Sequence, residues 1–551
     1  MSAPPSQIIR SETDILIVGA GPTGLLLANF LGGMGVRTTI VERNLTTVQE
    51  PRAVSIDDES MRALQAANLA GDVAKITAKG YGSIYRGPSG KVFAEVKPDL
   101  REYGFDKRNA FEQPAFEDCL RKGLMRHASV TTLFGTALET LTQDAGGVTA
   151  ELIGPTGPQH IRARYMVACD GGRSTTRKLL DIALIGSTFR EPWLIVDLHS
   201  TRNACFHTEV FCNPKRSAIS LPGPGGIRRY EFKLNAGETT EEAETEAFAR
   251  RLMAEIGPDE NSPIRRQQVY TFHARTAARW REGRIFLAGD AAHLTPPFAG
   301  QGMNSGLRDA HNLAWKLDEA LRLEAPEPLL ASYEQERKPH AWEMIKLALN
   351  MGKVMIPSSA IASALIRTGF GILGLYPPAK AYVAQMKYKP RPRFIGGMLR
   401  PDGKSRQHTA VGRMIPQPLV TTVQRDEVLL DCVLPDSPIA LVFDVDPQKA
   451  LSPELQAQFE QAGATVIGLT PEWINPQDGR FTVVRDRSRF FSAAPFADYL
   501  GQILLVRRDR YIAAAAPLSD ASTLLDTLRL MRVARMGELV AVRLKREGAG
   551  R

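Results

Sequence analysis

The stretch from residue 14 to residue 42 constrains the fold most strongly, because its pattern fits a single β-α-β unit. Residues 15–18 form an all-apolar run that predicts a buried strand, and residues 38–41 form a second strand-like run. The segment between them is rich in Leu and Ala and predicts a helix, which a G-x-G-x-x-G turn opens. Glu42 ends the second strand, where a carboxylate can accept hydrogen bonds from the ribose hydroxyls of an adenosine. The turn alone is a weak signal, but together with the strand, the helix and Glu42 it predicts a dinucleotide site.

The three glycines of this turn, Gly19, Gly21 and Gly24, have different tasks. The first permits the tight turn, the second lets the backbone approach a pyrophosphate, and the third lets the helix pack closely on the strand. The N–H groups that open a helix favour negative charge, so they would stabilise the phosphates. Arg43 and Arg52 are candidate counter-charges, because a guanidinium can give two hydrogen bonds to a phosphate.

Two later segments repeat the pattern of a strand followed by a turn in which Asp adjoins Gly. A strand predicted over residues 164–168 leads to Asp170, and one predicted over residues 284–287 leads to Gly289 and Asp290. The second turn continues into a loop with two prolines and two further glycines, after which a helix is expected. Glycines in such a loop let the backbone come close to a ligand.

Together, these three segments resemble the FAD-dependent aromatic hydroxylases, the single-component flavoprotein monooxygenases of the p-hydroxybenzoate and phenol hydroxylase type. The resemblance is strong over residues 14–345 and loose over residues 395–551. Residues 51–59 and 306–317 are most similar to 3-(3-hydroxyphenyl)propionate hydroxylases. The resemblance implies an α/β fold with a Rossmann-like FAD-binding domain, an inserted substrate-binding β-sheet domain and a C-terminal thioredoxin-like α/β domain.

Changes in composition along the chain, taken with this resemblance, predict four parts. Strand-like segments separated by Gly- and Pro-containing turns indicate a sheet inserted between the dinucleotide-binding halves. The last part has no CxxC and therefore no thiol redox chemistry, so packing or subunit contact is its expected role. The predicted boundaries are residues 1–75, 111–185 and 276–345 for the FAD-binding domain, 76–110 and 186–275 for the substrate-binding sheet, 346–394 for a helical connection, and 395–551 for the thioredoxin-like domain.

Helical periodicity continues after the last glycine loop. It is expected over residues 310–323 and 332–350. Pro326, Pro328 and Pro339 are expected to mark helix boundaries, because proline removes a hydrogen bond from a helix interior.

Composition favours a cytoplasmic enzyme. The net charge of +9 could suit nucleic acid, but 60 acidic residues are interspersed with 69 basic ones, and the basic clusters lack interleaved aromatic residues. An attraction for anionic cofactors and substrates is the milder explanation. Five cysteines without a CxxC argue against a disulfide framework or a zinc site, and residues 1–11 lack the apolar core of a signal peptide. The hydrophobic residues 358–376 are interrupted by Arg367 and glycines, which favours a buried helix over a membrane span.

The resemblance also assigns the cofactor site. Asp290 would accept a hydrogen bond from the ribityl chain, and backbone amides around residues 300–304 would face the pyrimidine edge of the flavin. Asp170 would serve both FAD and a transiently bound nicotinamide. The predicted cofactor-binding residues are Gly19, Gly21, Pro22, Thr23, Gly24, Glu42, Arg43, Arg52, Gln113, Asp170, Gly289, Asp290, Pro297, Gly300, Gly302, Met303 and Asn304. No metal site is expected.

The proton acceptor for such a reaction is not evident. Hydroxylation requires the phenol oxygen to be deprotonated or hydrogen-bonded, so that the ring attacks the distal oxygen of a flavin C4a-hydroperoxide. The phenol hydroxylases have an Asp where this chain has Val54, and the nearby Asp57 and Asp58 are expected to belong to the next helix. His273 and Tyr270 are the first candidates, although a packed, structural His and Tyr on the same strand is an equally good interpretation.

Two further features bear on the substrate. Pro296 and Pro297 match a proline pair beside the flavin, where a backbone carbonyl faces substrate and nicotinamide. A substrate carboxylate would require a cation, and Arg228, Arg229 or Lys233 in the inserted sheet could provide one. For all three, exposure at the surface is the stronger expectation.

The resulting hypothesis is an NAD(P)H- and O2-dependent FAD monooxygenase that hydroxylates a phenolic ring beside its hydroxyl group. Because only the G-x-G-x-x-G at residues 19–24 follows a predicted strand, NADH or NADPH would bind transiently, without a Rossmann domain of its own. Tailoring of a polyketide by hydroxylation or Baeyer–Villiger oxygen insertion is the alternative. A flavin-dependent halogenase is disfavoured, since no tryptophan lies in a WxWxIP motif, and a non-enzymatic dinucleotide sensor would need the first motif alone. The expected partners are a small phenol and O2, without nucleic acid or membrane, and a homodimer is left open.

Overall fold

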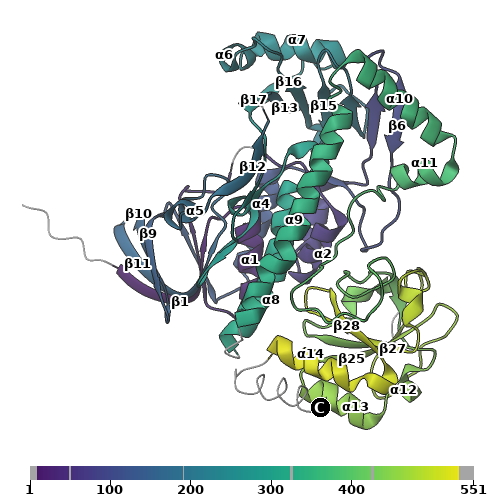
Figure 1. Cartoon of the computed structure of the whole chain (residues 1–551). Helices are drawn as coiled ribbons and strands as arrows, with labels where there is room; N and C mark the ends of the chain where they lie inside the picture. Colours follow the sequence, from purple (N-terminus) through teal and green to yellow (C-terminus); the bar gives the residue numbers. More distant parts are fainter. Residues whose placement is uncertain (1–8, 49–50, 190, 323–326, 424–426, 533–551) are drawn as a thin grey trace, which may run out of the picture. The chain divides into compact units, whose positions relative to one another are not determined.

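The computed structural model of the chain describes residues 9–48, 51–189, 191–322, 327–423 and 427–532 (Figure 1). These residues divide into two compact units. The first unit is drawn from Met1–Arg101, Phe105–Ala310 and Ala341–Pro390, and the second from Glu102–Gly104, His311–His340 and Arg391–Arg551.

The first unit contains a sheet with a parallel centre, of strand order β19-β20-β11-β1-β2-β8, which β9 and β10 extend. The bounds are β1 Ile9–Val18, α1 Pro22–Gly33, β2 Thr38–Glu42, β8 Val130–Phe134, β9 Ala137–Asp144, β10 Gly147–Gly154, β11 Gly157–Ala168, β19 Arg281–Glu282 and β20 Ile285–Leu287. Helix α1 connects the parallel strands β1 and β2, so the predicted β-α-β unit is present. Apolar side chains of β1, β10 and β11 form its buried core.

The register of this sheet brings the three predicted turns together. Strands β1, β11 and β20 run parallel, and Val18 pairs with Ala168, which in turn pairs with Leu287. These are the last residues of the three strands, so all three strands end at one edge of the sheet. The Gly19, Asp170 and Asp290 turns, which follow directly, therefore lie side by side at the carboxyl edge, where open α/β sheets bind ligands.

A second, seven-stranded sheet of the first unit combines two distant stretches of the chain. Its strand order is β17-β13-β16-β15-β14-β5-β6. The bounds are β5 Ser83–Arg86, β6 Val92–Val96, β13 Trp193–Leu198, β14 Thr208–Phe211, β15 Ala218–Pro222, β16 Arg228–Lys233 and β17 Ile264–Tyr270. The inserted substrate-domain sheet that the fold class requires is therefore present.

Both faces of this sheet are covered. On one face, Leu194, Tyr230 and Phe232 pack with side chains of helix α7 (Glu246–Ile256) in one apolar cluster. On the other face, Trp193 and Ile195 belong to a cluster that includes Phe298, from the loop after the Gly289 turn. Successive side chains of a strand point to opposite faces, so β13 contributes Leu194 and Val196 to the first cluster and Trp193 and Ile195 to the second.

Two small sheets and several helices complete the first unit. The sheets have the orders β12-β18-β21 and β3-β7-β4. The bounds are β3 Ser55–Ile56, α2 Asp58–Ala66, α3 Ala70–Lys75, β4 Thr77–Lys79, β7 Asn109–Phe111, α4 Gln113–Leu124, α5 Thr175–Leu179, β12 Leu184–Thr188, α6 Thr240–Ala243, β18 His273–Ala277 and β21 His293–Leu294.

The helices after the glycine loop differ from the prediction in one respect. Helix α8 spans Gly302–Arg322 and α9 spans Glu327–Met355, and Pro328 stands at the second residue of α9. Pro339 does not end a helix, as predicted, but lies inside α9. Tyr333 before it and Met344 after it are fully buried, and this packing offsets the hydrogen bond that proline removes. Pro326 lies outside the described residues.

The hydrophobic stretch near residue 367 forms a helix, but the helix is not buried as expected. Helix α10 spans Ala360–Gly374 and is followed by α11, Pro377–Ala384. Ile361 is 74% exposed and Leu365 69%. Strand β6 contacts α10, and the ring centroids of Phe93 and Phe370 lie 5.6 Å apart. This contact covers only part of α10, because Ile361 and Leu365 remain exposed. Among the described helices, none alone is long and apolar enough to cross a membrane; the pair α9 and α10, bent by 108°, passes by length and composition.

The second unit contains a mixed seven-stranded sheet of order β23-β22-β26-β25-β24-β27-β28. The bounds are β22 Leu419–Thr421, β23 Val428–Leu429, β24 Ile439–Phe443, α12 Pro447–Ala450, α13 Pro453–Gln461, β25 Thr465–Thr470, β26 Val483–Asp486, β27 Gln502–Val506, β28 Ile512–Pro517 and α14 Ser522–Arg532. Its parallel centre (β24, β25, β26) and antiparallel edge (β27, β28) give the α/β domain expected at the C-terminus. Apolar clusters fill both faces, and Cys432 is exposed.

A buried network of charges also belongs to the second unit. Glu336 accepts hydrogen bonds from Lys316 at 2.7 Å and from Arg507 at 2.7 and 2.8 Å, and Arg507 also pairs with Asp509 at 2.5 Å. All four side chains are at most 1% exposed. The two cations lower the pKa of Glu336 to about 2, so the carboxyl stays charged although it is buried.

Candidate active site

The glycines of the first turn differ in the space around them. Gly19 has a φ of +104°, and a Cβ there would lie 2.4 Å from the carbonyl oxygen of Cys169. A Cβ on Gly24 would lie 2.0 Å from the carbonyl oxygen of Gly19. No atom lies within 4 Å of a Cβ placed on Gly21. The first and third glycines are therefore required by packing, while the second leaves open space at the start of α1, where a pyrophosphate would lie.

Glu42 lies beside this turn. Its Oε2 accepts a hydrogen bond from the Ala20 backbone N–H at 2.9 Å, and its Oε1 accepts one from the Asn44 backbone N–H at 3.0 Å. The side chain is half-buried, so its carboxylate remains accessible to a ribose. The adjacent Arg43 is exposed.

The loop that carries Arg52 is held by its backbone. Gln113 Oε1 accepts hydrogen bonds from the N–H groups of Arg52 (3.0 Å) and Ala53 (2.7 Å). Arg229 donates to the carbonyl oxygen of Arg52 at 2.6 Å and also to that of Pro51. The Arg52 side chain itself is exposed, so it remains available for a ligand. Gln113, predicted to bind the cofactor, shapes the loop in this structure.

Asp170 and Asp290 follow the two other strands. Asp170 Oδ2 accepts hydrogen bonds from the backbone N–H and the hydroxyl of Thr176, both at 3.0 Å. Its Oδ1 is buried without a hydrogen-bond partner among the described residues. Asp290 is exposed, yet desolvation by the surrounding protein raises its pKa, and the charge of Arg52 acts in the opposite direction. The charges of His293 and Arg52 both favour the ionised form of Asp290.

Asp309 is a residue of this site that sequence reasoning missed. Its Oδ2 accepts a hydrogen bond from the Gly289 backbone N–H at 3.0 Å and lies 2.7 Å from Nε2 of His293. Both side chains are fully buried. Asp309 therefore fixes the turn that presents Asp290. The signal in the sequence is its place in the run 306–317, which is similar to the family but by itself gives the carboxylate no role.

Asn304 is fully engaged in holding the glycine loop. Its Nδ2 donates to the carbonyl oxygens of Gly300 (2.7 Å) and Ser55 (3.0 Å), and its Oδ1 accepts from the Asp57 backbone N–H at 3.0 Å. The side chain is fully buried, so only its backbone could face a ligand. Gly302 and Met303, at the start of α8, are half-buried. Thr23 lies against the Gly289 turn, because a Cβ on Gly289 would be 2.6 Å from the Thr23 hydroxyl.

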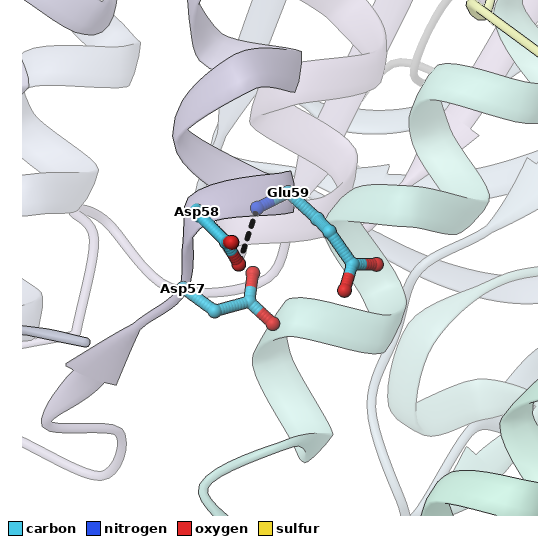
Figure 2. A group of neighbouring side chains, drawn as sticks. All are labelled: Asp57, Asp58 and Glu59. Carbon is cyan, nitrogen blue, oxygen red and sulfur yellow. Dashed lines mark hydrogen bonds between the residues drawn. The ribbon is translucent and has the colours of Figure 1, made fainter. Parts of the chain in front are cut away.

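Three buried carboxylates lie together at the start of α2 (Figure 2). Asp57 caps the helix by accepting from the Ser60 backbone N–H at 2.9 Å, as its predicted place at the next helix implies. Lys389 Nζ lies 2.9 Å from Asp57, 2.6 Å from Glu59 and 3.8 Å from Asp58. The lysine thus supplies the positive charge that a metal ion would supply in such a cluster. Burial raises the pKa of Asp58 to about 7.

Arg308 links this acidic cluster to the glycine loop. It donates to Asp57 at 2.9 Å and to Gln301 Oε1 at 2.7 Å, and it is 4% exposed. Through Arg308 the acidic cluster is connected to Gln301 of the glycine loop. Arg308 and Lys389 are the cations that pair with its carboxylates.

The loop after the Gly289 turn belongs to an apolar cluster formed with the inserted sheet. Phe298, next to Pro297, packs against Phe189 at 5.5 Å, Trp193 at 5.6 Å and Phe272 at 5.9 Å between ring centroids. Tyr270 is partly buried against the same cluster, whereas His273 is not part of it. The loop beside the predicted flavin site and the inserted sheet thus meet through aromatic side chains.

Tyr270 and His273 lie on two strands of different sheets and not on one strand as predicted. The hydroxyl of Tyr270, on β17, accepts from Arg266 at 2.5 Å and donates to Gln268 at 3.1 Å. Nδ1 of His273, on β18, lies 3.0 Å from the hydroxyl of Thr188, and burial lowers its pKa. The Tyr270 and His273 side chains therefore have different hydrogen-bond partners and do not form a pair with each other in the contacts described.

The basic residues expected at the surface of β16 are largely buried. Arg228 is 3% exposed and donates to Ser220 at 2.7 Å; Arg229 is 5% exposed and pairs with Asp197 at 2.7 Å. The expectation of surface exposure is therefore wrong for these two, because both faces of the sheet are covered and each guanidinium has oxygen partners. Lys233 is half-buried.

Comparisons with known proteins agree with this geometry. A family model described as "FAD binding domain" matches residues 12–348, and one described as "HcaD C-terminal domain" matches residues 412–531. The chain is 38% identical over 507 residues to a 3-(3-hydroxy-phenyl)propionate/3-hydroxycinnamic acid hydroxylase of Mycolicibacterium smegmatis, covering 91% of this chain and 90% of that protein. The protein of the same name from Escherichia coli K12 is 35% identical over 542 residues, 97% of each chain.

Solved structures show the same fold. The flavin-dependent monooxygenase PieE, solved with FAD and substrate, is 20% identical with a TM-score of 0.77 and covers 95% of this chain and 99% of its own. Aklavinone-11 hydroxylase with FAD and aklavinone is 24% identical with a TM-score of 0.74, over 94% and 98% of the two chains. The open space at Gly21 and the unpartnered oxygen of Asp170 fit a bound dinucleotide. On these grounds, the chain belongs to the FAD-dependent aromatic hydroxylases, the flavoprotein monooxygenases that hydroxylate aromatic rings.

Proposed function

We propose that this enzyme hydroxylates a phenol with a short acidic side chain, of the type of 3-(3-hydroxyphenyl)propionate, using NAD(P)H and O2. The relatives at 35–38% identity carry this activity in their names. The observation that carries the proposal is the meeting of three turns at the ends of β1, β11 and β20, next to the aromatic cluster around Phe298. In this arrangement the three turns would form a dinucleotide site beside an apolar cluster, the two environments that ring hydroxylation requires.

The residues of the three turns would hold FAD, which when bound would take hydride from NAD(P)H and deliver activated oxygen to the substrate. Gly21 and the N-terminus of α1 would face the pyrophosphate, and Glu42 the adenosine ribose. Arg52 would neutralise phosphate charge. Asp290, whose side chain is exposed, would accept a hydrogen bond from the ribityl chain, and the free Oδ1 of Asp170 would accept another.

The aromatic cluster would bind the substrate ring. Phe298 and Trp193 present apolar surface, and Tyr270 adds a hydroxyl at the edge of the cluster. Pro297 would place a backbone carbonyl beside the ring. His273, on the neighbouring strand, remains a candidate that acts from outside the cluster. Exclusion of water by these side chains would protect the activated oxygen from wasteful release as peroxide.

The G-x-G-x-x-G pattern follows a strand only at residues 19–24, and its second occurrence, at residues 369–374, lies within α10. NADH or NADPH would therefore reach the flavin as a transient co-substrate. We place the enzyme in the cytoplasm, with small molecules as its partners.

A substrate screen tests the proposal. Phenolic acids and resorcinols are added to the FAD-loaded protein, and NAD(P)H oxidation and product mass are followed. A meta-substituted phenolic acid should raise NAD(P)H oxidation well above the substrate-free rate and give a product heavier by one oxygen. If no phenol couples NAD(P)H oxidation to a product, the proposed function is wrong, whatever the FAD content.

A further inference from the structure

Strand β16 places one carboxyl group on the side of the inserted sheet that faces the Phe298 cluster. Tyr230 and Phe232 belong to the cluster on the opposite face, with α7. Because side chains alternate along a strand, Glu231 points to the Phe298 side. The strand pairing gives its neighbours: Glu231 lies directly between Ile195 of β13 and Ile219 of β15. Both isoleucines are members of the Phe298 cluster.

Glu231 has no short-range hydrogen-bond partner in the described part of the chain. It is 5% exposed, and its side chain accepts no hydrogen bond from any described residue. Its ion pair is long, with 4.0 Å between Oε1 and Nη1 of Arg229. Arg229 is already committed, since it gives short hydrogen bonds to Asp197 and to the Arg52 carbonyl oxygen. The fully buried side-chain atoms without a partner, among the described residues, do not include the Glu231 oxygens, so the carboxylate keeps some access to solvent and a ligand hydroxyl could reach it.

We propose that Glu231 is the general base of the hydroxylation, with its carboxylate accepting a hydrogen bond, and then the proton, from the hydroxyl group of the bound phenol. This inference rests on the proposed function and names the residue that acts on the substrate. The substrate O–H bond breaks, its electron pair moves into the ring, and the proton forms a new O–H bond on the Glu231 carboxyl. The electron-rich ring carbon then forms a C–O bond to one oxygen atom of O2, whose O–O bond breaks with the two electrons that NAD(P)H would deliver through FAD. The hydrogen on that carbon leaves as a proton, and the ring becomes aromatic again.

The other candidates are less suited to accept a proton. The Tyr270 hydroxyl already accepts from Arg266 and donates to Gln268, so its proton is engaged within the protein. His273 lies outside the cluster. Asp57 is paired with Lys389 and Arg308. Burial raises the pKa of Glu231 to about 7, opposed by Arg229, and a base with a pKa near the working pH is the most effective.

A binding measurement without turnover provides the first test. Calorimetry on the FAD-loaded protein, without NAD(P)H, compares 3-(3-hydroxyphenyl)propionate with 3-phenylpropionate, which lacks the hydroxyl. Wild type should bind the hydroxylated compound more tightly by at least about tenfold, the usual contribution of a hydrogen bond to a charged group. Glu231→Gln should reduce that ratio towards one, while its affinity for 3-phenylpropionate and for FAD stays within about threefold. Glu242→Gln, on the exposed α6 of the same inserted region, is the matched control and should keep the wild-type ratio.

The second test follows product formation in a single turnover across pH and needs the wild type alone. Glu231 must be deprotonated to act, so the yield with a weakly acidic phenol should fall as pH drops through about 7. A phenol whose own pKa lies below about 6, as with fluorine on the ring, should show no such fall. The groups with a charge or an exchangeable proton on the same face of the sheet as Glu231 are Arg229 and Lys233 of β16, Asp197 of β13, and Arg266 and Tyr270 of β17; β15 presents apolar Ile219 opposite Glu231.

Different outcomes would contradict the role of Glu231 and the proposed hydroxylase function. An unchanged hydroxyl preference in Glu231→Gln, or a wild-type yield that does not depend on pH with the weakly acidic phenol, would overturn the role of Glu231 while hydroxylation itself stands. If wild type forms no hydroxylated product from any phenol, the proposed function fails, and the role of Glu231 fails with it.

Discussion

Replacement of single glycines by alanine should separate the fold of the first turn from its ligand. At Gly24, the new Cβ would lie 2.0 Å from the Gly19 carbonyl oxygen, well inside contact distance, so α1 or the turn must shift. We expect Gly24→Ala to lower the free energy of unfolding by about 1–3 kcal/mol, as overpacking usually does. At Gly21, the Cβ meets no atom within 4 Å, and the residue has φ −77° and ψ −178°, which alanine adopts readily. Gly21→Ala should therefore leave the stability of the FAD-free protein unchanged or slightly higher.

FAD affinity should fall in Gly21→Ala, the variant whose stability is expected to be unchanged. The methyl group of Gly21→Ala would occupy the space assigned to the pyrophosphate, so FAD affinity should fall by at least about tenfold, or about 1.4 kcal/mol. Flavin fluorescence titration measures the affinity, and urea denaturation of the FAD-free protein measures the stability. Wild-type FAD affinity in Gly21→Ala would refute the assignment of this turn as the pyrophosphate site. An unaltered stability in Gly24→Ala would refute the packing argument.

Three further predictions concern single side chains. Glu42→Ala should weaken FAD binding by about 1–3 kcal/mol in the same titration, because ribose hydroxyls lose their acceptor; unchanged affinity would remove Glu42 from the site. Cys432→Ser should leave turnover within about twofold, since the thiol is exposed in the second unit, and a hundredfold loss with intact folding would contradict a packing role for that unit. The pKa of Glu336 is lowered by Arg507 and Lys316 to about 2, so its contribution to stability is present above about pH 4.5 and is lost as pH falls towards 2. Glu336→Gln should lower the unfolding free energy at pH 7 by about 3–5 kcal/mol in urea and make stability less dependent on pH below 4.5; an equal acid dependence in both proteins would contradict this.

The sequence predicted the three turns and their ligand class because their glycines and carboxylates sit directly after apolar strands. The family resemblance grouped the three turns, and the parallel register of β1, β11 and β20 explains physically why they meet at one edge. An inserted sheet was also expected, and the assignment of the predicted cofactor residues to FAD stays a prediction.

The burial of the charged residues on β16 could not be predicted from the sequence. In residues 228–233, an alternating strand pattern shows which residues share a face, but not whether that face is exposed. Arg229 and Glu231 are buried because the Phe298 loop, from more than sixty residues further along the chain, covers that face. Likewise, hydrophobicity predicted a helix near residue 367 but could not show that α10 would remain exposed.

The origin and position of the new oxygen test the central claim most directly. The enzyme is given labelled O2, NAD(P)H and 3-(3-hydroxyphenyl)propionate, and the product is analysed by mass spectrometry. The account predicts one labelled oxygen on a ring carbon ortho or para to the existing hydroxyl, because the phenol oxygen donates electron density to those carbons. Label in a new ester or lactone would instead show oxygen insertion, and an oxygen drawn from water would contradict the monooxygenase assignment.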